Sequence, residues 1–194
     1  KPIVQVGDSV EEGQMIAEAD GFISANIHAP ISGTVKKIAK APQVAGTNVD
    51  TIIIERNKDI PPKEWTKKKL KPTDINLETF INTLKTKGIV GLGGAVFPTH
   101  VKFMLKPDQK LHTIMINACE CEPYLNVDYR TILEETDLFI EGLNIIKKAT
   151  KVTRIIIGVE NNKPKALEKL KTELKTTLAI NVVPLKTKYP QGGE

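Results

Sequence analysis

The chain has 194 residues, of which 40% are hydrophobic and 26% charged, and its net charge is +5. These proportions are ordinary for a globular protein with room for one large domain or two modest ones. No apolar run approaches the roughly eighteen residues of a membrane-spanning helix, so we expect no direct membrane insertion. The start, KPIVQVGDSV, carries no secretory signal pattern, and with the end, YPQGGE, it suggests an excised fragment.

Lysines are densest at 63–72, where a single aromatic residue interrupts them, which is typical of a basic linker and not of a nucleic-acid surface. Cys119 and Cys121 are too few for a disulfide framework and are separated by one residue only. Without further cysteines, this pair cannot complete a zinc or iron–sulfur site, so we expect no metal site. A reducing, cytoplasmic setting fits best.

Residues 1–57 have the pattern of a small all-β domain, because short apolar runs alternate with glycine and proline turns. The motifs V-G-D-x-V-x-x-G and I-x-A-P-x-S-G-T-V resemble the biotinyl/lipoyl-type barrel-sandwich domain. Such carrier domains present a lysine at a hairpin tip. Here no lysine occurs between Asp20 and Lys36, so we expect a structural module without a swinging arm. Residues 58–75, rich in proline and lysine, are the predicted linker.

The second predicted domain spans 76–194 and has an α/β pattern. A helix is expected over 76–88, ending at Gly88, and the apolar runs at 111–118, 152–159 and 179–185 are expected to be buried strands. Between the strands, apolar residues share a helical face over 129–149 and recur with helical spacing over 163–174. Alternation of strand and helix predicts a parallel sheet with crossover helices.

Ligands of parallel sheets gather at the carboxyl ends of the strands. Two polar segments follow predicted strands there: NACECEPY, beginning at Asn117, and YPQGGE at the end of the chain. The amide of Asn117 and the carboxylates of Glu120 and Glu122 suit the hydroxyl groups of a ribose or a ribityl chain.

The stretch GIVGLGGAVFPTHVKF (88–103) is a further candidate site. It is no Rossmann fingerprint, because it follows a helix and its glycine spacing differs, and it is no P-loop, because it lacks G-K-[ST]. Its glycines would let backbone N–H groups approach a phosphate or ring, Lys102 would neutralise a phosphate, and Phe97 would stack on a ring. His100 is expected at the helix surface or hydrogen-bonded. A tight turn without ligand stays open as the alternative.

Together, GIVGLGGAVFPTHVK, INACECEPYLNVDYR and YPQGGE resemble the RnfC-like family of the Rnf electron-transport complex over essentially the whole chain. A more distant likeness is to the NADH- and FMN-binding subunit of respiratory complex I. The resemblance implies an FMN site in which no side chain is catalytic, since hydride passes between nicotinamide and flavin. It implies FMN contacts at ten positions: Gly91, Gly93, Gly94, Lys102, Asn117, Glu120, Tyr189, Gly192, Gly193 and Glu194. It implies NADH contacts at Phe97 and Glu122.

The same resemblance implies electron transfer between NADH and a ferredoxin-type partner, in a complex with other subunits at the inner face of the cell membrane. The family's iron–sulfur region would lie beyond Glu194, so the fragment alone is expected to be inactive. Val96 stands where a glycine is common, and Cys119 where complex I relatives carry an aspartate. Two alternatives stay open: a soluble electron-transfer relative, such as a cobalamin reductase or a proline-reductase partner, and a scaffold that has lost the cofactor.

Overall fold

The computed structural model describes residues 1–43, 46–64, 75–92, 95–106, 109–120, 122–177 and 179–191. The predicted site residues Gly93, Gly94, Gly192, Gly193 and Glu194 lie outside the described residues, as do Cys121 and most of the predicted linker. The chain divides into two compact units, one of Lys1–Lys71 with Glu78–Met104 and one of Pro72–Leu77 with Leu105–Glu194. The predicted domain limits of 1–57, 58–75 and 76–194 stay predictions.

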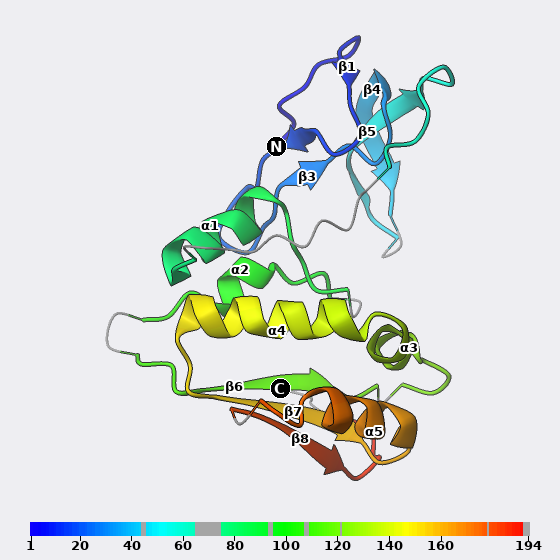
Figure 1. The fold of residues 1–194 in the computed structure, drawn as a ribbon. Helices are drawn as coiled ribbons and strands as arrows, with labels where there is room; N and C mark the ends of the chain where they lie inside the picture. Colours follow the sequence, from blue (N-terminus) through cyan, green and yellow to red (C-terminus); the bar gives the residue numbers. More distant parts are fainter. Residues whose placement is uncertain are drawn as a thin grey trace. The chain divides into compact units, whose positions relative to one another are not determined.

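The first unit contains the expected barrel-sandwich strands. Strands β1 (Ser9–Val10), β4 (Gly33–Pro42) and β5 (Asn48–Arg56) form an antiparallel sheet, and β2 (Met15–Ala17) pairs with β3 (Ile27–His28) (Figure 1). Their small core consists of Val4, Val10, Ile16, Ala29 and Val35. Gly33 tolerates no side chain, because a Cβ there would lie 2.1 Å from the carbonyl oxygen of Glu55 on the paired strand.

The first unit also holds α1 (Leu77–Thr86), apart from Leu77, and the short helix α2 (Thr99–Lys102). Gly88 follows α1 with a φ of 64°, the left-handed conformation that commonly ends a helix, as expected from the sequence. The ring of Phe80 on α1 meets the ring of Phe103, just after α2, edge to face with centroids 5.0 Å apart. This aromatic contact joins the two ends of the segment that contains the glycine-rich stretch.

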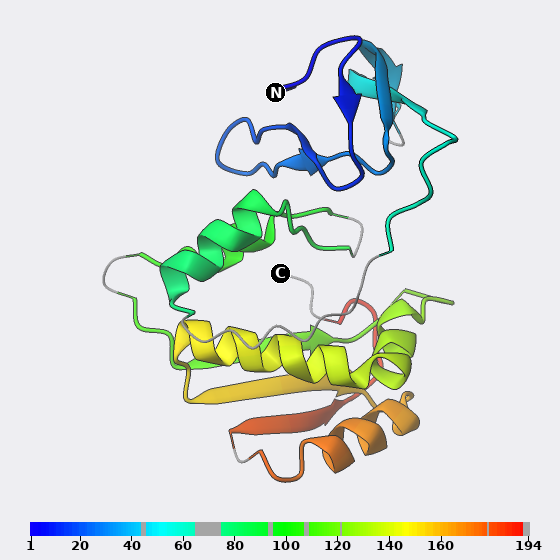
Figure 2. The ribbon, with the colours of Figure 1, turned by 45° about the horizontal axis from the view of Figure 1, so that its top comes forward.

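The second unit is the expected α/β fold. Strands β6 (Thr113–Ala118), β7 (Arg154–Glu160) and β8 (Ile180–Leu185) are parallel and lie in that order. Helices α3 (Val127–Glu134), α4 (Thr136–Thr150) and α5 (Pro164–Glu173) connect them, with α4 running along the sheet and α3 at its end (Figures 1 and 2). The core centres on the middle strand, where Ile155, Ile157 and Val159 are almost completely buried.

One expectation for this unit is wrong: the helical face predicted over 129–149 is divided between two helices. The backbone leaves the helical conformation at Glu135, with φ −122° and ψ 35°, and α4 starts at Thr136. The buried Thr136 hydroxyl donates to the carbonyl oxygen of Ile132 at 2.5 Å, so a side-chain bond spans the junction of the two helices. The break lets Ile132 and Leu143 enter the same core from two differently directed helices.

Candidate functional site

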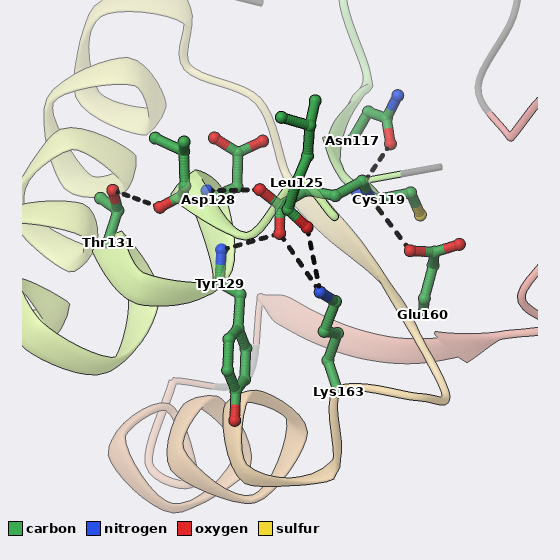
Figure 3. A network of polar contacts seen from close by, with 10 residues as sticks. Asn117, Cys119, Leu125, Asp128, Tyr129, Thr131, Glu160 and Lys163 are labelled. Atoms are coloured by element: carbon green, nitrogen blue, oxygen red, sulfur yellow. Dashed lines mark hydrogen bonds and ion pairs between the residues drawn. The ribbon is translucent and has the colours of Figure 1, made fainter. Parts of the chain in front are cut away.

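The carboxyl ends of the parallel strands carry the polar groups predicted from the sequence. At the end of β6 the Oδ1 atom of Asn117 accepts the N–H of Cys119 at 3.0 Å, a local bond that turns the chain out of the strand (Figure 3). Among the described residues, nothing pairs with the amide nitrogen of the exposed Asn117. It therefore remains available as a donor at the edge where parallel sheets bind ligands.

Glu120 caps the start of α3 from outside the helix. Its Oε1 atom accepts the N–H of Asp128 at 2.7 Å, and its Oε2 atom accepts the N–H of Tyr129 at 3.2 Å. These two groups belong to the first turn, whose N–H groups have no partner within a helix. Asn126, at the N-cap position, makes no side-chain capping bond. The carboxylate of Glu120 therefore supplies both the hydrogen bonds and the negative charge that a helix start favours.

Lys163 neutralises this carboxylate from the loop before α5. Its Nζ lies 3.6 Å from Oε2 of Glu120, and the two side chains are only 16% and 7% exposed. The same Nζ lies 5.1 Å from the centre of the Tyr129 ring and donates to the carbonyl oxygen of Leu125 at 3.5 Å (Figure 3). Lys163 thus connects the loop after β7 to both ends of the segment between Glu120 and α3.

Glu160, the last residue of β7, completes the cluster. It is fully buried, and its Oε2 accepts the backbone N–H of Glu120 at 3.2 Å (Figure 3). Its Oε1 is buried without a hydrogen-bond partner in the part of the chain that the structure describes. One carboxylate thereby holds the backbone of Glu120 while a cation, Lys163, holds its side chain.

Asp128 adds a second carboxyl group beside that of Glu120. Desolvation of its carboxyl and, after it, the charge of Glu120 raise the pKa of Asp128 above its ordinary value. The rise has the sign expected for an acid that is partly desolvated and placed next to a like charge. Negative charge at this edge is therefore only partly offset by Lys163.

The end of β8 is tied to the end of β7. The Oδ1 atom of Asn161 accepts both the N–H of Thr187 at 3.3 Å and its hydroxyl at 2.9 Å. Tyr189, two residues further on, is 74% exposed. Glu122, after β6, is also exposed. The structure thus places Asn117, Glu120, Glu122 and Tyr189 in the second unit, on segments that leave the carboxyl ends of β6 and β8.

The glycine-rich stretch belongs to the first unit and forms a hairpin. The N–H of Gly91 donates to the carbonyl oxygen of Phe97 at 2.9 Å, and that of Thr99 to Ile89 at 3.0 Å, which closes the stem. Lys102, on α2, places its Nζ 5.9 Å from the centre of the Phe97 ring. A cation and an aromatic ring, both predicted site residues, therefore stand together at the base of this hairpin.

Val96 is the unusual residue of the hairpin. Its φ is 52°, in the left-handed region that a β-branched residue adopts only under strain. Glycine adopts this conformation without a steric penalty. The backbone thus gives a physical reason why a glycine would suit position 96 better than the valine this chain carries.

His100 differs from the sequence expectation of a surface or hydrogen-bonded histidine. It is 4% exposed, and its Nδ1 is buried without a hydrogen-bond partner among the described residues. Burial and, to a smaller extent, the charge of Lys85 lower the pKa of His100 below its ordinary value. His100 is the buried residue of α2, a helix of only four residues.

Sequence reasoning missed Glu160 and Lys163. The sequence did contain a signal for these two residues. The segment E-N-N-K (160–163) follows the most strongly apolar of the predicted strands, which predicts that it lies at the carboxyl edge of the sheet. The described residues contain no group of three or more His, Cys, Asp and Glu side chains that could hold a metal ion. In the same residues, no helix has the length and apolar character needed to cross a membrane.

Comparison with known proteins gives two family matches that divide the chain. Residues 84–194 match the family described as Nuo51 FMN-binding domain, and residues 1–59 match the RnfC barrel sandwich hybrid domain.

Whole-chain relatives agree with these matches. The C subunit of a proton-translocating ferredoxin:NAD(+) oxidoreductase complex from Clostridium ljungdahlii is 42% identical, over 100% of this chain and 42% of that protein. The C subunit of the Na(+)-translocating complex from Acetobacterium woodii is 37% identical, over 100% of this chain and 44% of that protein. The C subunit of an ion-translocating oxidoreductase complex from Rhodobacter capsulatus is 39% identical, over 100% and 38% respectively. The chain spans less than half the length of these curated relatives.

Proposed function

Because the chain belongs to the Nuo51 FMN-binding domain family and, with its barrel sandwich hybrid domain, to the RnfC family, we propose that it is a flavin- and NADH-binding electron-transfer module. In this proposal it passes electrons between NADH and a ferredoxin-type carrier, as part of an Rnf-type membrane-associated complex. The observation that carries the proposal is the succession, in one chain, of a barrel sandwich hybrid domain and an FMN-binding domain, together with relatives of the RnfC type that match along the whole chain.

The residues present fit a flavin mononucleotide. Its phosphate needs cationic and N–H donors, which Lys102 and the glycine-rich hairpin would provide. Its ring carbonyls and ribityl hydroxyls need donors and acceptors, and the amide nitrogen of Asn117 is available among the described residues. Gly91, Gly93, Gly94, Gly192, Gly193, Glu194 and Tyr189 are proposed as further FMN contacts, and Phe97 and Glu122 as contacts of NADH.

Glu120 is proposed to act on FMN through the loop that it organises. Its two oxygens are engaged by the first turn of α3 and by Lys163. The bound flavin supplies the hydride-accepting chemistry. The chain's residues bind and orient: Glu120 and Glu160 fix the path of the backbone between Asn117 and α3, and Phe97 presents a flat apolar face to a ring.

Further parts of the proposal concern the longer protein. Iron–sulfur clusters that accept electrons from the flavin would lie outside this chain, and the other subunits of the complex would hold the module at the cytoplasmic face of the membrane. A soluble relative, such as a cobalamin reductase or a proline-reductase partner, is the alternative within the flavoprotein class. Val96, strained by its positive φ, is the specific observation that favours a scaffold without cofactor.

The test is a flavin titration of a chain extended past Glu194 to the length of the relatives. We expect quenching of FMN fluorescence at micromolar concentrations and bleaching of the flavin absorption band when NADH is added. Gly93→Val should abolish FMN binding without altering the circular dichroism spectrum. Gly142→Val is the matched control, because a Cβ at Gly142 meets no atom within 4 Å. Absence of FMN binding by the extended chain would establish the scaffold.

A further inference from the structure

The loop between β2 and β3 carries apolar side chains at the place where carrier domains present their lysine. Phe22 and Ile23 in the loop are exposed by 65% and 63%, and Ile27, the first residue of β3, by 58%. Large apolar side chains exposed so close together are uncommon on a protein surface unless they contact a ligand or a partner. The loop therefore has a composition that its own fold does not explain.

The loop is fixed in shape by its own polar groups. The Oδ1 atom of Asn26 accepts the N–H of Ala19 at 2.9 Å, and the hydroxyl of Ser24 accepts the N–H of Asp20 at 3.0 Å. These bonds use the side chains of Ser24 and Asn26 internally. The segment that follows Asp20 presents Phe22 and Ile23 outward.

The same loop is held against the end of α1 and against Gly88, which comes just before the glycine-rich hairpin. The Nδ2 atom of Asn26 donates to the carbonyl oxygen of Thr86 at 3.5 Å. A Cβ at Gly88 would lie 2.2 Å from the carbonyl oxygen of Asn26, and the φ of Gly88 is itself 64°. Only glycine permits this approach, so the chain at position 88 is adapted to the contact with the loop.

A pocket of about 500 Å³ lies between the loop and the hairpin. One wall is formed by residues 23–28 and the other by the hairpin, including Val90, Phe97 and Pro98. The volume is within the range of small-molecule sites, about 300–1,000 Å³. Among the described residues that line it there is no Asp, Glu, Lys or Arg side chain, and His28 is the only titratable group.

This lining suits an uncharged flat ring, since charged groups would lose their hydration there without a partner. Lys102 lies beside the Phe97 ring, with Nζ 5.9 Å from the ring centre, and would attract a phosphate attached to such a ring. An uncharged heteroaromatic ring with a phosphate close by is the chemistry of a mononucleotide. Flavin and reduced nicotinamide mononucleotides share it.

We propose that the β2–β3 loop of the barrel sandwich hybrid domain is the second wall of a ring-binding pocket, opposite Phe97, and that this pocket takes the flavin or the nicotinamide ring. The inference rests on the proposed function and extends it to a domain that is otherwise a structural module. In place of a covalently attached arm, Ile23 of the β2–β3 loop and Ile27 at the start of β3 supply an apolar surface for a freely bound ring.

The decisive experiment compares two substitutions at adjacent positions. Ile23→Asp places a charge in the pocket lining, whereas Phe22→Asp places the same charge next to it, and the two parent side chains are 63% and 65% exposed. Each variant of the extended chain is titrated with FMN in one arm and, in the other, with reduced nicotinamide mononucleotide. We expect Ile23→Asp to weaken binding of the ring that occupies the pocket at least tenfold, and Phe22→Asp to change it less than twofold.

The ligand whose binding is weakened by Ile23→Asp is the one whose ring occupies the pocket. Ala25→Trp, which fills the pocket without adding charge, should have the same effect as Ile23→Asp, and the melting temperature of each variant reports whether it folds. If Ile23→Asp and Ala25→Trp bind both ligands as tightly as Phe22→Asp does, the loop is no wall of the site and the inference is wrong while the proposed function stands. If the unaltered chain binds neither ligand, the proposed function fails first.

Discussion

Replacing Lys163 by methionine tests whether the cluster at the strand ends holds α3 in place. The change removes the ammonium group but keeps a similar aliphatic stem over the Tyr129 ring. Removing one partner of a buried ion pair typically costs about 3–5 kcal/mol. Here the cost should be lower, about 2 kcal/mol, because Glu120 keeps two charge-assisted backbone hydrogen bonds and its Oε2 lies 3.6 Å from Nζ, beyond hydrogen-bond length.

Amide hydrogen exchange measures this effect locally. The N–H groups of Asp128 and Tyr129, which donate to Glu120, report opening of the first turn of α3. A loss of about 2 kcal/mol corresponds to roughly thirtyfold faster exchange, at about 1.4 kcal/mol per factor of ten. Lys169→Met is the control, because Lys169 on α5 pairs with Glu173 and each side chain of that pair is 43% exposed. Equal exchange rates in the two variants would show that Lys163 does not support Glu120.

Three further predictions concern backbone shape and protonation. Gly88→Ala should lower the free energy of unfolding measured in urea, because a Cβ would lie 2.2 Å from the carbonyl oxygen of Asn26 at a φ of 64°; unchanged unfolding would mean that this approach is absent. Burial lowers the pKa of His100, so folding favours its neutral form. The free energy of unfolding should therefore be highest above pH 6.5, the ordinary pKa of histidine, and fall as the pH drops below that value. His100→Gln should remove this pH-dependent loss from urea unfolding curves. Desolvation and the nearby charge of Glu120 raise the pKa of Asp128, so Asp128→Asn should increase the free energy of unfolding at pH 7, and the gain should vanish at or below pH 3.8. A gain that persists at low pH would point to a cause other than charge.

The sequence was sufficient for the elements whose burial is unambiguous. The runs at 111–118, 152–159 and 179–185 are strands because each is a nearly continuous apolar segment of strand length. The expected burial is right for β7 but wrong for much of the edge strands β6 and β8, where Met115, for example, is 79% exposed. The barrel sandwich hybrid fold followed from a glycine and proline pattern specific enough to carry a resemblance, and the family match confirms it. The resemblance to the RnfC family is confirmed as well.

What the sequence could not supply depends on contacts between distant residues. Glu135 has ordinary helical neighbours, and the break at this residue places Ile132 of α3 and Leu143 of α4 in one shared core. His100 is buried in a helix of four residues, and periodicity within so short a helix does not reveal which side chain is covered. In a short segment, the sequence pattern therefore does not predict which side chains are buried by residues elsewhere in the chain.

The role of Glu120 in the candidate site likewise depends on contacts that the sequence does not reveal. The resemblance assigned Glu120 to the polar edge of the flavin, and its position after β6 agreed with that role. In the structure, its carboxylate caps α3 and pairs with Lys163, and its backbone N–H is held by Glu160, so these polar groups of Glu120 are turned to the protein. A carboxylate used in this way fixes the position of neighbouring donors, of which the Asn117 amide nitrogen is available among the described residues. Glu120→Gln would keep one oxygen to accept from α3 but remove the charge that Lys163 needs, and should therefore weaken FMN binding together with the protection of the Asp128 and Tyr129 amides. Loss of FMN binding with full protection of these amides would instead show direct contact between Glu120 and the flavin.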